Sequence, residues 1–154
     1  MTWISPITDR QQEDIRLGTP KAFLNVSDFN RIEGNIRYLR EALNASNYPV
    51  GEQTHRTWTM TGVPNTGDIG RICENISMVA KAYFIPPRFE RLAEIPEKTS
   101  LNYEDVNDME EFLRWLHHEF VVARREHNTH RTLASRRHID LAQFTHNQLR
   151  RETF

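Results

Sequence analysis

The 154-residue sequence contains a single cysteine, Cys73. One thiol excludes an internal disulfide framework and fits synthesis in a reducing compartment. Because Cys73 follows Ile72, which belongs to an apolar pattern described below, we interpret it as a half-buried, inert thiol rather than a nucleophile.

Long hydrophobic runs are also missing, and the mean hydropathy is −0.69. No stretch approaches the roughly 20 apolar residues that a transmembrane helix requires. The opening residues, MTWISPITDR, contain neither a basic segment nor an apolar one. We therefore expect no signal peptide and no membrane partner, and synthesis in the cytoplasm.

Common catalytic motifs are absent: the chain has no Gly-rich phosphate loop, G-x-S-x-G elbow or Cys-x-x-Cys pair. Seven histidines invite a zinc site, but His118-Glu119 lacks the second histidine of His-Glu-x-x-His. Only His127 and His130 stand at a weakly suggestive spacing. The sequence therefore predicts no metal, no cofactor and no catalytic residue, so that the protein is not an enzyme.

Three segments share one plan, a capped amphipathic helix. Asn25-x-x-Asp28 is a variant of the capping box, in which each side chain accepts from the other residue's backbone N–H. The same cap returns as Asn65-x-x-Asp68 and as Asn102-x-x-Asp105. Apolar residues follow each cap at helical spacing. These stripes are Phe29, Ile32, Ile36, Leu39 and Leu43; Ile69, Ile72, Ile76, Val79 and Tyr83; and Val106, Met109, Leu113, Leu116 and Phe120.

The sequence therefore predicts a mainly α fold, with three capped amphipathic helices in a bundle. The core spans 21–127 and consists of three related units, 24–44, 64–84 and 101–127. The connector 85–99 is expected to hold one or two helical turns, and 57–61 a short extended segment at most.

Residues 1–20 form an N-terminal arm with a short helix over Arg10–Leu17, capped by Thr8 or Asp9 and ended by Gly18. The arm either lies across the bundle or reaches a neighbour. Its expected anchors are Trp3, Ile7, Ile15 and Leu17.

Some polar positions recur beside the stripes. Asn35 and Asn75 could bond to the backbone of a neighbouring connector, or they could be exposed, and the sequence leaves both readings open. Arg31 and Arg71 recur without a packing role. The acidic pairs are interpreted as caps and exposed helix faces rather than a glycosidase dyad. These pairs are Asp105 with Asp108 and Glu110 with Glu111.

Charge is divided unevenly along the chain. Residues 121–154 hold seven arginines and three acidic residues, a net charge of +4, which leaves −5 on residues 1–120. We expect 128–154 to be a basic C-terminal tail that docks onto a neighbouring chain. The predicted partner-binding residues are Trp3, Arg124, Arg125, Arg131, Arg136, Arg137, Ile139, Leu141, Phe144 and Leu149.

Several short motifs resemble a small module of tailed phages and prophages of Gram-positive bacteria. They are I-T-D-R at 7–10, F-L-N-x-x-D-F-N-R-I-E-x-N-x-x-Y-L at 23–39, W-T-M at 58–60, D-I-x-R-I-x-x-N-I at 68–76 and L-N-Y-E-D-V-N-D-M-E at 101–110. That family occurs in structural proteins of phage tails, beside fibre or baseplate genes. Its members often end in a glycine-containing segment, whereas 129–154 has no glycine.

The resemblance implies a structural adaptor, a component of a virion tail that joins tail, baseplate or fibre proteins and self-associates in a symmetric assembly. The rival interpretation is a nucleic-acid-binding module that neutralises phosphates with the arginines of the tail. The acidic body disfavours this rival, and so does the near absence of aromatic residues among the tail arginines.

Overall fold

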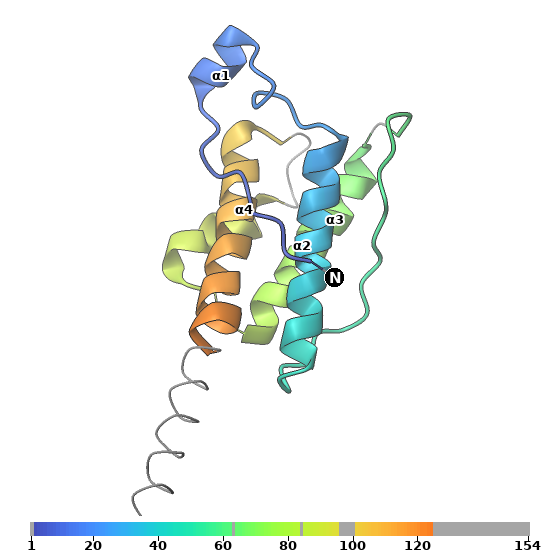
Figure 1. Cartoon of the computed structure of the whole chain (residues 1–154), viewed down its shortest axis with the longest axis vertical. Coiled ribbons are helices and arrows are strands. Elements are labelled where there is room, and N and C mark those ends of the chain that lie inside the picture. The colour runs from blue at the N-terminus through green and yellow to red at the C-terminus, as the bar shows by residue number, and fades with distance from the viewer. Residues whose placement is uncertain (1, 63, 84, 96–100, 125–154) are drawn as a thin grey trace, which may run out of the picture. The chain divides into compact units, whose positions relative to one another are not determined.

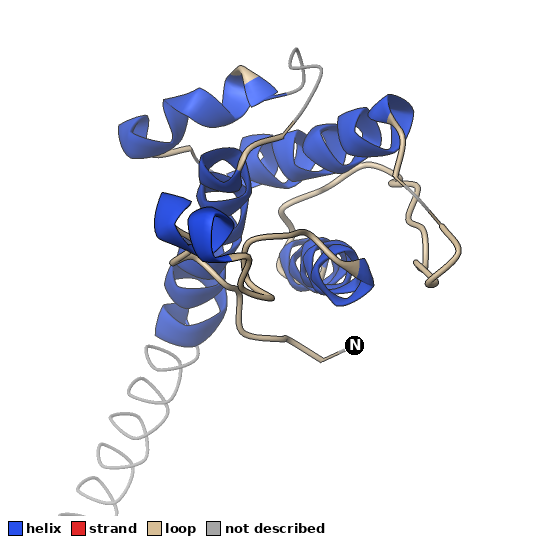
Figure 2. Ribbon diagram, turned by 90° about the horizontal axis from the view of Figure 1, so that it is seen from above, coloured by secondary structure: helices blue, strands red, loops and turns tan. Residues whose placement is uncertain are grey.

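The computed structural model describes residues 2–62, 64–83, 85–95 and 101–124. The chain divides into two units, residues 1–117 and 118–154. The mainly α fold class is confirmed, because the described residues form helices joined by loops and contain no strand (Figure 2). The helices are α1 (Gln12–Leu17), α2 (Val26–Asn44), α3 (Thr66–Tyr83), the 3-10 helix η1 (Pro87–Ala93), α4 (Tyr103–Leu116) and the π-helix η3 (His117–Val122).

The three predicted caps are all present. Asn25 Oδ1 accepts from the Asp28 N–H at 3.2 Å, and Asp28 Oδ2 accepts from the Asn25 N–H at 3.0 Å. Asn65 and Asp68 exchange the same two bonds, and so do Asn102 and Asp105. Each box satisfies backbone N–H groups that the first turn leaves without helical partners.

The predicted start of the first helix is wrong. The first helix begins at Gln12 rather than Arg10, because the Asp14 carboxylate accepts from the Gln11 N–H at 2.8 Å and closes the turn there. Gly18 ends it with φ 62°, a left-handed conformation that suits glycine. The third long helix is α-helical over Tyr103–Leu116, continues as a π-helix over His117–Val122 and is helical up to 124, while the predicted end at 127 lies outside the described residues.

The core is built around α2, which packs against both α3 and α4 (Figure 1). All five stripe residues of α2 are buried, as are the first four of α4. On α3 the middle of the stripe is buried, whereas Ile69 and Tyr83 at its ends are only half-buried. The predicted connector helix is η1, which packs against α4 and α3 and buries Phe89. The bundle therefore gains a fourth, short helix beside the three that the caps predict.

Asparagine side chains hold extended segments against the helices. Four asparagines each form two hydrogen bonds with the backbone of one other residue. The asparagine Nδ2–H donates to the carbonyl of that residue, and the asparagine Oδ1 accepts from its N–H. The pairs are Asn35 with Ile4, Asn107 with Arg10, Asn30 with Trp58, and Asn44 with Val50. Asn75 donates to the Thr54 carbonyl at 2.8 Å. The connector-bonding interpretation of Asn75 is confirmed, and Asn35 plays the same part for the arm.

The arm lies across α2 and α4 of its own chain, but two of its four predicted anchors are wrong (Figure 1). Ile15 is 44 % exposed and Leu17 60 % exposed, because α1 has no buried residue. The arm is fastened by Trp3, which stacks on His117, by Arg10, which is 4 % exposed, and by the two asparagine pairs at Ile4 and Arg10.

Candidate functional site

Four buried charges from the arm, α2 and α4 form what we call the arginine–carboxylate cluster. Its members are Arg10, Asp28, Arg31 and Glu110. Glu110 Oε2 accepts from Arg10 at 2.7 Å, and its Oε1 accepts from Arg31 Nε at 2.6 Å. Asp28 Oδ1 accepts from both arginines, at 3.1 Å and 2.5 Å. Two guanidinium groups thus face two carboxylates, and the cluster is electrically balanced.

This pairing favours a structural role for the cluster. Burial alone would lower the pKa of Arg31, but hydrogen bonds to Glu110 and Asp28 outweigh it and raise the pKa. Arg31 therefore stays charged at any physiological pH, and its charge is opposed by buried carboxylates. A buried charge is tolerated only when it is paired in this way. The cluster can pin the arm and α2 to α4, and its charges already engage one another.

A further buried carboxylate, Glu33 on α2, fastens α3 and the connector that precedes it. Arg71 donates to both Glu33 oxygens, at 2.5 Å and 3.0 Å. The Trp58 indole N–H donates at 3.2 Å, and His55 Nδ1 lies 3.1 Å away. The glutamate is 2 % exposed, and the hydrogen bonds from Arg71 raise the pKa of that guanidinium. We call these four residues the Glu33 cluster.

His55 is the imidazole of the Glu33 cluster, and histidine is the side chain whose usual pKa lies closest to neutral pH. Burial lowers the pKa of His55 below its usual value of 6.5, and the hydrogen bond and charge of Glu33 oppose the shift only in part. Its Nε2 is buried and has no hydrogen-bond partner in the described part of the chain. Protonation would place a charge there beside Arg37 and Arg71, so the folded state favours the neutral ring.

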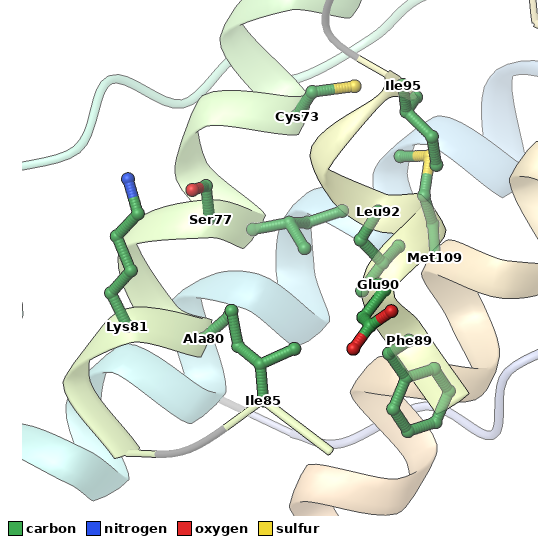
Figure 3. A pocket seen from close by; sticks show the side chains of 11 residues that line it. Cys73, Ser77, Ala80, Lys81, Ile85, Phe89, Glu90, Leu92, Ile95 and Met109 are labelled. Carbon is green, nitrogen blue, oxygen red and sulfur yellow. The ribbon is translucent and has the colours of Figure 1, made fainter. Parts of the chain in front are cut away.

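An apolar groove lies between α3 and η1, and Met109 of α4 also lines it (Figure 3). Its volume is about 620 Å³, within the usual range of roughly 300–1,000 Å³ for binding pockets. Small side chains on α3 make the room. They are Cys73, Ser77 and Ala80. From the other side come Ile85, Phe89, Leu92 and Ile95, with Lys81 and Glu90 at the edges.

Cys73 lines the groove with a small side chain, and its thiol is unreactive. The residue is 5 % exposed, and burial, aided by the charge of Asp105, raises the pKa of its thiol to about 11. A thiolate is the nucleophilic form, and almost none is present at neutral pH. This environment agrees with the prediction of an inert thiol, but Cys73 is buried rather than half-buried.

Of the predicted partner-binding residues, the structure describes two. Trp3 is half-buried and stacks on the His117 ring, with centroids 4.0 Å apart and planes 5° apart. Arg124 is exposed and its guanidinium lies 5.4 Å from the Phe120 ring centroid. The others lie outside the described residues: Arg125, Arg131, Arg136, Arg137, Ile139, Leu141, Phe144 and Leu149.

Sequence reasoning missed the buried charges. Glu110 was predicted on an exposed helix face, yet it is 0 % exposed, and Asp105 is 1 % exposed. The signal was available, because Glu110 stands three residues before Leu113 and four after Val106, at the border of the stripe. Arg31 and Arg71, which seemed to lack a packing role, are the partners of buried carboxylates. The groove could also have been predicted, because small residues follow one side of α3 at Cys73, Ser77 and Ala80.

In the ranges that the structure describes, no three histidine, cysteine or acidic side chains are grouped so as to hold a metal ion. His127 and His130 lie outside those ranges. None of the described helices is both long and apolar enough to cross a membrane. Comparisons with protein-family models, with curated proteins and with solved structures find no match to this chain.

Proposed function

We propose that this protein is a non-enzymatic structural adaptor that joins other proteins within a particle. The observation that carries the proposal is that the buried charges and the groove have separate roles. The charges pair with one another and tie the arm, the connector and three helices into one scaffold. The groove is apolar and large enough to receive side chains of a partner.

The particle we propose is a phage tail or a tail-like assembly. The support is the resemblance of the motifs, whose residues have definite places in this fold. I-T-D-R supplies Arg10, and D-F-N-R-I-E-x-N supplies the α2 side of both clusters. N-D-M-E supplies Asn107, Met109 and Glu110. The motifs therefore mark an architecture, and its use in a tail remains our proposal.

Particles purified from the phage or prophage that encodes this chain test the proposal. Quantitative mass spectrometry should find the chain at a constant ratio to the tail proteins, and a variant lacking 128–154 should remain folded but be lost from particles. A chain found only outside the particles, in material where the tail proteins are abundant, would refute the adaptor. Binding of duplex DNA by the full-length protein at physiological salt, lost with the same deletion, would favour the nucleic-acid rival.

A further inference from the structure

The groove between α3 and η1 has an acidic border. Glu90 lines it, and Glu94 directly precedes the lining residue Ile95. Glu74 stands seven residues before Lys81, so two helical turns place both on the same side of α3. The three glutamates are exposed, and none forms an ion pair with another described residue. With Lys81 the border carries a net charge of −2.

One segment of this chain has the complementary chemistry. Residues 136–151 hold four arginines and one aspartate, a net charge of +3. Between the arginine pairs stand four large apolar residues, which are Ile139, Leu141, Phe144 and Leu149. A basic segment with apolar anchors matches an apolar groove with acidic edges, the arrangement by which many proteins bind a peptide.

We propose that the groove of one copy binds residues 136–151 of a second copy. Apolar side chains of the segment would enter between α3 and η1, and its arginines would face Glu74, Glu90 and Glu94. One contact between these unlike surfaces leaves the pair with one free groove and one free tail, so the association extends into a ring or a filament. The choice of a second copy rests on the proposed adaptor function, since self-association requires tails that reach a neighbour. Eleven residues, 125–135, connect Arg124 to the segment, and a fully extended chain of that length spans up to about 36–40 Å, which permits such a reach.

Two full-length variants separate the two halves of this contact. Ile85→Asp places a charge in the groove, and because Ile85 is already 38 % exposed its replacement does not empty the core. The double variant Phe144→Asp, Leu149→Asp removes two anchors from the tail. Met60→Asp is the matched control, since Met60 is a large apolar residue, 91 % exposed, that does not line the groove. Thermal melts establish that each variant is folded.

Light scattering after size exclusion should show that the wild type and Met60→Asp associate as concentration rises. Each of the two interface variants alone should be monomeric. Their equimolar mixture should form a dimer and stop there, because only one intact groove can meet one intact tail. If Ile85→Asp does not fold, Glu90→Lys is used in its place. We expect Glu90→Lys to weaken self-association by up to about fivefold, and this effect should become smaller at high salt, which screens the charges of the border.

Other outcomes overturn the proposal. Association that persists in both interface variants would place the contact elsewhere. A monomeric wild type whose tail variant binds a labelled 136–151 peptide would mean that the groove holds the chain's own tail. A monomeric wild type whose tail variant does not bind that peptide would refute the groove as a site for the tail. If the mixture forms dimers but the chain is absent from particles, the adaptor proposal is refuted and the contact between groove and tail is retained.

Discussion

Glu110 and Glu111 are neighbours in the chain and opposite in environment. Glu110 is fully buried between two arginines, whereas Glu111 pairs with Arg114 on the surface of α4. The same side chain thus serves in one case as an internal counter-charge and in the other as a solvated group. The difference arises because successive residues of a helix point about 100° apart.

We expect Glu110→Gln to lower the free energy of unfolding by about 3–5 kcal/mol, since it leaves Arg10 and Arg31 buried with too little negative charge. Glu111→Gln should cost about 0–1 kcal/mol, as for other exposed pairs. Urea denaturation of both variants measures the difference. Equal losses would show that Glu110 is hydrated and not an internal counter-charge.

A second residue-scale prediction concerns pH and His55. The unfolded chain takes up a proton near pH 6.5, while the folded state, with its lowered pKa, resists the proton. The stability that depends on neutral His55 is therefore fully present above pH 6.5 and is lost as pH falls toward the folded pKa.

Unfolding free energies measured between pH 7 and pH 5 should decline in the wild type and decline less in His55→Asn, which keeps a donor for Glu33 without titrating there. His118→Asn, which replaces an exposed histidine, should follow the wild type. A His55→Asn profile parallel to the wild type would mean that other groups cause the acid sensitivity.

At the scale of elements, asparagines perform two tasks. Asn102 caps α4 and satisfies local N–H groups, whereas Asn107, one turn later, bonds to the Arg10 backbone 97 residues away. Capping can be deduced from neighbours in sequence. The long-range pairing depends on which extended segment passes that face of the helix.

Asn102→Ala should cost roughly 1 kcal/mol, the usual price of a lost cap, and leave the arm in place. Asn107→Ala should free the arm, because it removes both bonds to the Arg10 backbone and leaves those groups part-buried. Limited proteolysis with mass mapping distinguishes the two, with cleavage before α2 accelerated only in Asn107→Ala. Unchanged cleavage in that variant would show that the arginine–carboxylate cluster alone holds the arm.

For the whole molecule, the arm is a structural part of the bundle rather than an appendage. It supplies one of the two cations of the arginine–carboxylate cluster and the ring that stacks on His117. Its removal unbalances charges on α2 and α4 that remain buried.

Deleting residues 2–11 should therefore destabilise the bundle by several kcal/mol, seen as a lower melting temperature by circular dichroism. Arg10→Met, which keeps the arm but removes its charge, should account for most of the loss. A deletion that melts like the wild type would mean that Arg31 alone satisfies both carboxylates.

Much of the scaffold followed from the sequence alone. The boxes at Asn25, Asn65 and Asn102 and the apolar stripes predicted where α2 and α3 begin and end to within one residue, and where α4 begins. These features depend on residues three or four positions apart, and that spacing acts through the geometry of a single helix. The mainly α fold class follows from the same local rules.

Only the tertiary structure decided which charges are inside. Arg10 and Glu110 are 100 residues apart in sequence, and Arg31 and Glu110 are 79 apart, so no local pattern pairs them. The groove likewise required η1 to pack against α3 and α4 while leaving the small side chains of α3 uncovered. A charged side chain is buried when an oppositely charged side chain from another part of the chain packs against it. The size of a groove depends on the space that the neighbouring side chains leave empty. Both are properties of packing, which the spacing of residues along one helix does not contain.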